Sequence, residues 1–193
     1  VDVILGGGIY KADPPSYCNV YPESYNQPNP DKRQYIIDLA VNDGYTFVSD
    51  KDQLAAAAAD NAEKVLGMFE QNGIGGGKTV EHFWVDGTPY PAGEPTLAEM
   101  TAAALDILEE DKDGMFLMVE GSQVDWQNHG NNVEGQIAES LGFDAAVEVV
   151  MNWVEAKQSR KNQTLVLIVA DHNTGGFDIN GPGNALTQPG EIV

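Results

Sequence analysis

The chain has few basic residues and no long apolar run. Its 193 residues include 10 Lys and Arg against 30 Asp and Glu, which gives a net charge of −20. Such a charge repels nucleic acid and anionic membranes, and no Lys/Arg cluster offsets it. No stretch approaches the roughly 18 consecutive apolar residues that a membrane-spanning helix requires. We therefore expect neither a nucleic-acid-binding surface nor a membrane partner.

Cysteine is equally scarce. The one cysteine, Cys18, excludes an intrachain disulfide and leaves the redox compartment open. It lies in a Tyr/Pro/Asn-rich stretch without a nearby His, so we expect no catalytic role for it. The sequence begins at Val1 with an apolar segment and not with Met, so the absence of a signal peptide says nothing about the destination.

Short apolar segments alternate with segments of helical periodicity along most of the chain. This rhythm is typical of an α/β protein, mainly a parallel sheet flanked by helices. We expect strands at 2–5, 45–48, 64–69, 115–119 and 164–170, and helices near 31–42, 50–59, 96–110 and 135–158. The stretch 71–95 is rich in Gly and Pro and predicts a loop insertion with a small hairpin. The length fits one domain with a sizeable core.

Carboxylates and imidazoles follow two of the expected strands, at the point where each strand ends. Asp171 and His172 come directly after the apolar run 164–170. The run 115–119 is followed by Glu120, Asp125 and His129. Because open α/β sheets bind ligands beyond the carboxyl ends of their strands, we expect these side chains to lie close together.

These residue types at this spacing favour a metal site. Asp125 and His129 are four residues apart, so one helical turn places both on the same face. Oxygen and imidazole ligands together suit Zn²⁺, whereas Glu120 offers the hard oxygen that suits Mg²⁺. Either segment alone is a weak signal, because an Asp-His pair is often a surface pair or a capping device. Both together predict two or three ions, since three buried carboxylates without cations would be costly.

At these residues the sequence resembles the alkaline phosphatases. The resemblance is carried by Met118–His129 and Val169–Gly176, and extends in the family's order to Val3–Gly8, Lys64–Phe69 and Pro95–Thr101. It implies an alkaline-phosphatase-like fold and a secreted or periplasmic homodimeric metalloenzyme. Such an enzyme hydrolyses phosphate monoesters through a phosphoserine intermediate, using two zinc ions and one magnesium ion.

Matched residue by residue, the resemblance assigns each candidate ligand to an ion. Glu120 corresponds to the magnesium ligand, Asp125 and His129 to ligands of one zinc, and Asp171 and His172 to ligands of the other. Trp126 follows a zinc-binding Asp at a position where family members vary. It is a candidate substrate-binding residue that shapes the phosphate pocket, although a packing role is an equal alternative.

Several residues of the family's site have no counterpart in this sequence. These are the nucleophilic Ser of a D-S-A motif, the metal-bridging Asp, the magnesium-binding Thr, the phosphate-clamping Arg and a C-terminal His. Only Arg33 and Arg160 are available, and both are expected to face solvent at helix ends. We therefore expect residues 1–193 to form one partial alkaline phosphatase domain with no catalytic residue of its own, inactive in isolation.

Two other functions stay open at this point. Another hydrolase of the same superfamily, a phosphodiesterase or a sulfatase-like enzyme, would share the ligands at the strand ends. A non-catalytic metal-binding module would also account for the acidic and imidazole side chains. The E-G-S-Q-x-D-W spacing of residues 120–126 favours the phosphomonoesterase.

Overall fold

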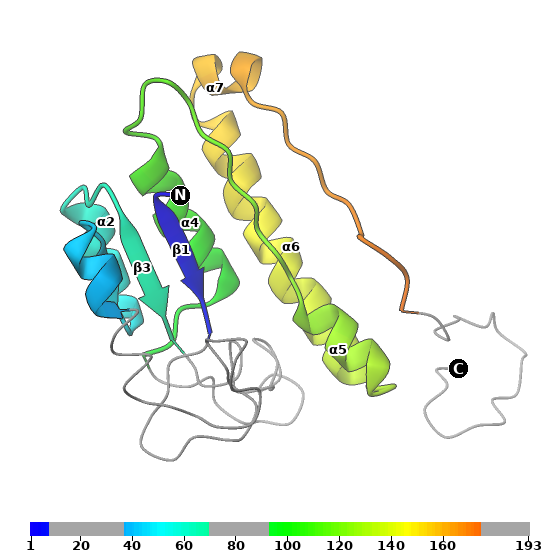
Figure 1. Ribbon diagram of the computed structural model, residues 1–193. Coiled ribbons are helices and arrows are strands. Elements are labelled where there is room, and N and C mark those ends of the chain that lie inside the picture. The colour runs from blue at the N-terminus through cyan, green and yellow to red at the C-terminus, as the bar shows by residue number, and fades with distance from the viewer. Residues whose placement is uncertain (8–36, 70–92, 175–193) are drawn as a thin grey trace, which may run out of the picture.

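A computed structural model describes residues 1–7, 37–69 and 93–174 of the chain (Figure 1). Its elements are β1 (Val3–Gly6), β2 (Thr46–Val48), α2 (Lys51–Ala59), β3 (Val65–Met68), α4 (Leu97–Leu108), α5 (Gln123–His129), α6 (Val133–Glu155) and α7 (Gln158–Gln163). Residues 37–42 are also helical. The predicted hairpin within 71–92, Cys18 and Arg33 lie outside the described residues.

The three described strands form one parallel sheet in the order β1-β3-β2. Val65 of β3 lies opposite Val3 of β1 on one side and opposite Thr46 of β2 on the other. Parallel neighbours need a crossover connection, and α2 provides it between β2 and β3. The α/β prediction with a parallel sheet flanked by helices is therefore confirmed.

Helices α2 and α4 pack against the sheet and close its core (Figure 1). The largest buried apolar side chains of this core come from β2, α2, β3, α4 and the residue after β3: Val48, Leu54, Val65, Phe69, Met100 and Ile107. Local sequence signals fix where both helices begin. The Asp50 carboxylate accepts from the Gln53 N–H at 2.8 Å, and Thr96 and Glu99 form the capping box that the T-L-A-E sequence of residues 96–99 predicts.

Helix α6 packs on α4 and α5 through small residues. Its buried positions include Gly135, Ala138, Gly142 and Ala146. The apolar spacing of residues 135–158 predicts that Ile137, Leu141, Val147, Val150 and Val154 face inward. Val154 is buried as predicted, whereas Ile137 and Leu141 are exposed, so the prediction is wrong for those two. Small side chains allow the neighbouring helices to come close, whereas Ile137, Leu141 and Met151 of α6 are exposed. Among the described helices, none is both long and apolar enough to cross a bilayer.

The segments 115–119 and 164–170, predicted as buried strands, do not join the sheet. Both run extended without ladder partners, and most of their apolar side chains are exposed, whereas Met115, Leu117, Val119 and Val166 are half-buried. Phe116 is 90% exposed and Leu165 is 81% exposed. Burial of such a strand needs neighbours along both edges and cover on both faces. The described helices α2 and α4 do not provide that cover for these segments.

The two extended segments nevertheless run in the same direction as the strands. In Figure 1, both descend alongside α6 towards the end of the molecule at which β1 and β3 terminate. Helix α5 begins at this end, and the segment 164–170 reaches Asp171 there. The segments that carry the candidate ligands thus end on the side of the molecule where the strands end, and the role of these residues as ligands stays a prediction.

Candidate metal centre

Helix α5 places Asp125 and His129 one turn apart on the same face. The His129 Nε2 atom lies 3.4 Å from Asp125 Oδ2. The helical turn predicted from the D-x₃-H spacing is therefore present. Asp125 is half-buried whereas His129 is exposed, so the imidazole remains accessible to a ligand from solvent.

Asp171 and His172 form a second pair at the end of the extended segment. The His172 Nε2 atom lies 3.3 Å from Asp171 Oδ2, and the His172 backbone N–H donates to Asp171 Oδ1 at 3.0 Å. Both side chains are exposed. In each pair, one carboxylate and one imidazole therefore lie within 3.4 Å of one another, with the imidazole open to solvent.

Thr174 connects the two pairs. Its hydroxyl donates a hydrogen bond to Asp125 Oδ1, so the turn that follows His172 contacts the first residue of the other pair. Sequence reasoning missed Thr174 as a site residue. The only signal was its position in the D-H-N-T-G-G motif, which does not reveal a contact across 49 residues of sequence.

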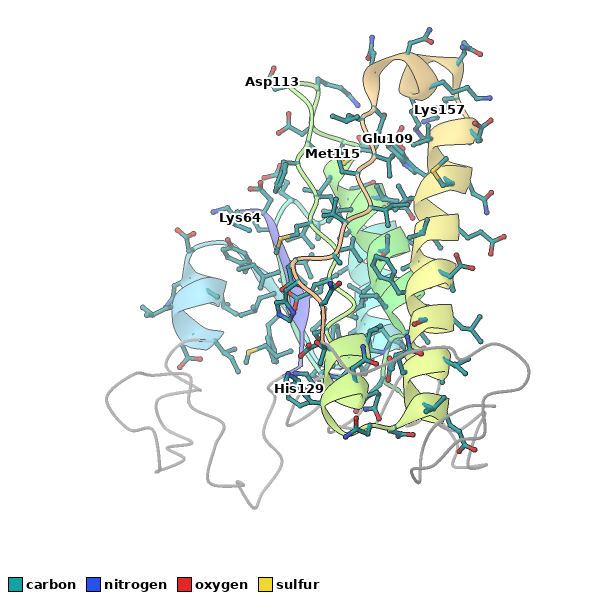
Figure 2. All side chains as sticks on the ribbon, turned by 90° about the vertical axis from the view of Figure 1, so that its right-hand side faces the viewer. Lys64, Glu109, Asp113, Met115, His129 and Lys157 are labelled. Atoms are coloured by element: carbon teal, nitrogen blue, oxygen red, sulfur yellow. The ribbon has the colours of Figure 1, made fainter. Side chains whose placement is uncertain are left out.

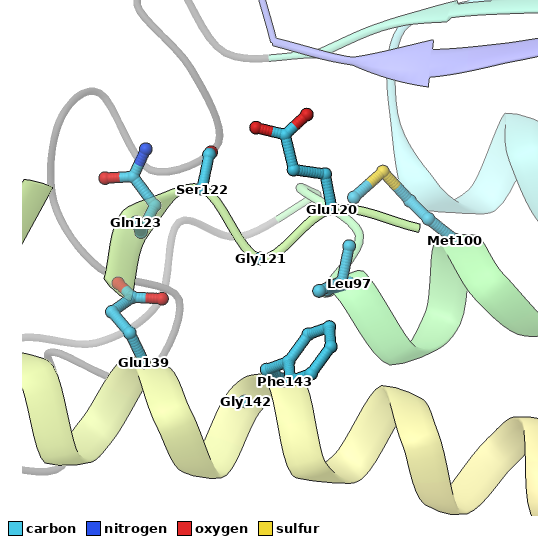
Figure 3. A pocket seen from close by; sticks show the side chains of 9 residues that line it. All are labelled: Leu97, Met100, Glu120, Gly121, Ser122, Gln123, Glu139, Gly142 and Phe143. Carbon is cyan, nitrogen blue, oxygen red and sulfur yellow. The ribbon is translucent and has the colours of Figure 1, made fainter. Parts of the chain in front are cut away.

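Glu120 lies at the turn that leads into α5. Together with Gly121, Ser122 and Gln123 it lines a cavity of about 50 Å³ whose other walls come from α4 and α6. Figure 3 shows the Glu120 carboxylate directed away from α6, while the Glu139 carboxylate of α6 is directed towards the turn. Glu120 is exposed and has an accessible hard oxygen donor.

Asn132 fixes the corner between α5 and α6. Its Oδ1 atom accepts from the Gly135 N–H at 3.1 Å, and its Nδ2 atom donates to Gln127 Oε1 at 2.8 Å. A Cβ atom on Gly135 would lie 2.5 Å from Gln127 Oε1, so a larger residue there would have to displace the hydrogen-bonded amide groups of Gln127 and Asn132. The corner sets the direction of α5 and therefore the position of Asp125.

The donor chemistry of these side chains fits zinc and magnesium. Three carboxylates and two imidazoles are ligand types that Zn²⁺ accepts, and a carboxylate oxygen is what Mg²⁺ prefers. Within residues 1–7, 37–69 and 93–174, no three His, Cys, Asp or Glu side chains gather closely enough to hold an ion. The chain thus brings its donors together as two pairs and a single carboxylate.

Arg160 is not the solvent-facing residue that the sequence predicted. Its side chain is 11% exposed, stacks on the Trp153 ring at 4.0 Å and donates to the Trp153 carbonyl at 2.7 Å. It also donates through Nε and Nη2 to Glu109, which accepts from Lys157 at 2.6 Å as well. Figure 2 shows Glu109 and Lys157 near α7, well away from His129. Arg160 is therefore a structural residue at the far end of the molecule.

Glu109 is the acceptor at the centre of this ion cluster. The hydrogen bonds from Arg160 and Lys157 lower the pKa of the Glu109 carboxyl to about 2. The carboxylate thus ties the end of α4 to α7 and to the segment just before it.

The parallel α/β sheet with helices on it is the architecture of many hydrolases. The sequence matches the family model described as Alkaline phosphatase over residues 1–191. Curated relatives include Alkaline phosphatase 3 and Alkaline phosphatase 4 of Bacillus subtilis (strain 168). They are 31% and 32% identical to the chain over 191 residues. Both matches cover 98% of this chain and 34% of the relative.

A solved structure agrees with this result. The alkaline phosphatase of Thermus thermophilus matches 80% of this chain and 28% of its own, at 26% identity and a TM-score of 0.59. The chain belongs to the alkaline phosphatase family. It spans about a third of the length of the curated relatives it matches.

Proposed function

We propose that this chain supplies the metal-binding half of a phosphomonoesterase site. The observation that carries the proposal is the hydrogen bond from Thr174 to Asp125, which brings the Asp171–His172 turn to helix α5. Two carboxylate–imidazole pairs then face one region of the molecule, in a chain that belongs to the alkaline phosphatase family.

The proposed ligand assignment follows these pairs. Asp125 and His129 hold one zinc ion, Asp171 and His172 hold a second, and Glu120 holds magnesium. Bound zinc supplies a Lewis acid that polarises a phosphoryl oxygen and lowers the pKa of a coordinated hydroxyl group. Helix α5 orients the first pair, and the turn from Asp171 to Thr174 orients the second.

Trp126 is the proposed substrate-facing residue of this chain. It is exposed on α5, directly after Asp125, and has no place in the buried core. A large ring beside a metal ligand can limit the size of the ester group that enters. The role of Trp126 is tested by comparing KM for small and bulky monoesters in Trp126→Ala.

The nucleophile and the phosphate-clamping Arg are proposed to come from outside this chain. Of the two arginines, Arg160 is committed to Glu109 and Trp153. The decisive experiment assays the 193-residue chain and the full-length natural protein with a phosphate monoester, with added zinc and magnesium. The proposal predicts turnover by the full-length protein, loss of turnover with a chelator, and negligible turnover by the chain alone. Robust activity of the 193-residue chain would contradict it.

A substrate panel separates the alternatives within the superfamily. Monoesters, diesters and sulfate esters are each supplied to the full-length protein. Preference for monoesters supports the alkaline phosphatase assignment, whereas a preference for diesters or sulfate esters supports the other hydrolases. Zinc binding without hydrolysis of any ester would support the third alternative, a non-catalytic metal-binding module.

The remaining parts of the proposal rest on family membership. They are a single partial domain spanning 1–193 with an insertion near 71–95, a homodimeric intact enzyme, and a periplasmic or extracellular location. Sedimentation of the full-length protein tests the dimer, and fractionation of the source cells tests the location.

A further inference from the structure

Glu139 is a buried carboxylate that the metal assignment does not use. It lies on α6 and is only 5% exposed, although a carboxylate is rarely buried to this extent without a role. It lines the same small cavity as the turn from Glu120 to Gln123. In Figure 3 its side chain is directed towards that turn, on the opposite side from the Glu120 carboxylate.

The turn 121–123 packs closely against α6, but its polar groups still need hydrogen-bond partners. A Cβ atom on Gly121 would lie 2.8 Å from Phe143 Cδ2, so the backbone of the turn rests directly on α6. Ser122, which precedes α5, makes no side-chain capping bond. The first N–H groups of a helix have no partner within the helix and need acceptors from elsewhere.

Gln123 supplies an independent sign that the cavity holds polar contacts. Its side chain is 7% exposed, and its Oε1 atom is buried without a hydrogen-bond partner among the described residues. A cavity of about 50 Å³ has room for water, which needs about 10–15 Å³, and water can link such groups.

We propose that Glu139 is a positioning residue for the metal-ligand segment. Its carboxylate accepts hydrogen bonds from the backbone amides of the turn 121–123, directly or through water in the cavity. These bonds hold Glu120 and Asp125 at a fixed spacing, in the way that outer groups orient metal ligands in other proteins. The expected effect of Glu139 on magnesium affinity rests on the proposed function. The hydrogen bonds between Glu139 and the turn 121–123 do not depend on that function.

The experiment compares Glu139→Gln and Glu139→Leu with Glu148→Gln in the full-length protein. Glu148 is an exposed residue of the same helix and serves as the matched control. Amide hydrogen exchange is measured on peptides covering 120–128, and magnesium affinity is measured by calorimetry. We expect exchange at 121–123 to rise about tenfold or more in Glu139→Leu, with a smaller rise in Glu139→Gln, which keeps one acceptor oxygen.

Magnesium affinity should fall about 10- to 100-fold in Glu139→Leu and less in Glu139→Gln, while Glu148→Gln matches the wild type. Unchanged exchange at 121–123 in both Glu139 variants overturns the proposal. So does increased exchange along all of α5 and α6, because that pattern reports general unfolding. A wild-type protein that binds no magnesium contradicts the proposed function instead, and the exchange measurement still decides the role of Glu139.

Discussion

At the scale of single residues, two side chains from different segments contact the carboxylate of Asp125. The His129 imidazole lies near Oδ2, and the Thr174 hydroxyl donates to Oδ1. Asp125 is therefore the point at which helix α5 and the turn after His172 meet. Loss of the Thr174 contact should separate the two ligand pairs without removing any proposed ligand.

Thr174→Val tests this role because valine has nearly the same shape but lacks the hydroxyl. We expect zinc affinity of the full-length protein to fall about tenfold, as for other residues that orient metal ligands. Thr174→Ser keeps the hydroxyl and should stay close to the wild type. Zinc titration against a competing chelator provides the measurement, and equal affinities for the valine and serine variants would contradict the prediction.

Glu109 should make the stability of the fold depend on pH. Because Arg160 and Lys157 lower the pKa of its carboxyl from 4.5 to about 2, the folded state binds the proton less readily than the unfolded state. The stabilisation is present above pH 4.5 and is lost as the pH falls towards 2. Glu109→Gln should lower the free energy of unfolding at pH 7 by about 1–2 kcal/mol, allowing for partial exposure.

Urea denaturation of Glu109→Gln and wild type at pH 7, 5 and 3 checks this prediction. The difference between the two proteins should shrink between pH 5 and pH 3. Glu110→Gln changes an exposed neighbour and should stay within about 0.5 kcal/mol of wild type. If the difference in the free energy of unfolding between Glu109→Gln and wild type did not change with pH, the ion cluster would not act through this carboxylate.

At the scale of elements, the corner between α5 and α6 depends on one side chain. The Asn132 side chain caps α6 by accepting from the Gly135 N–H. The same side chain donates to Gln127 and so also contacts α5. We expect Asn132→Ala to lower the free energy of unfolding by about 1–2 kcal/mol. Asn132→Asp keeps the capping oxygen and should stay within about 0.5 kcal/mol, because the Gln127 amide can turn to donate. Thermal unfolding distinguishes the two, and equal losses would contradict the capping role.

The elements that the sequence predicted well depend on neighbours in sequence. The capping box at Thr96 and the D-x₃-H turn of α5 involve residues three or four apart, so their pattern is visible in the chain itself. The family motifs likewise locate the candidate ligands within short segments. Their roles as ligands remain predictions.

The elements that the sequence predicted wrongly depend on distant partners. The apolar pattern of 164–170 records a preference for burial, but not which strands or helices would cover it. On α6, apolar size pointed to Ile137 and Leu141, whereas close helix packing selected Gly142 and Ala146. The Arg160–Glu109 ion pair and the Thr174–Asp125 bond join residues about fifty positions apart, which no local spacing reveals.

At the scale of the whole molecule, a strongly acidic chain directs several of its carboxylates to one end. With a net charge of −20, drawing the two pairs and Glu120 together into one site would be costly unless cations were bound there. Bound metal ions would neutralise these carboxylates. Family membership and the position of both pairs at the carboxyl end of the sheet support this proposal. Metal removal should therefore loosen this end of the molecule more than the core around Val65 and Phe69.

The most direct test is a crystal structure of the full-length protein grown with zinc, with diffraction recorded at the zinc absorption edge. We predict two anomalous peaks, one about 2.0–2.2 Å from Asp125 and His129 and the other at that distance from Asp171 and His172. Zinc bound elsewhere, or the two pairs on opposite sides of the sheet with no shared metal centre, would contradict it.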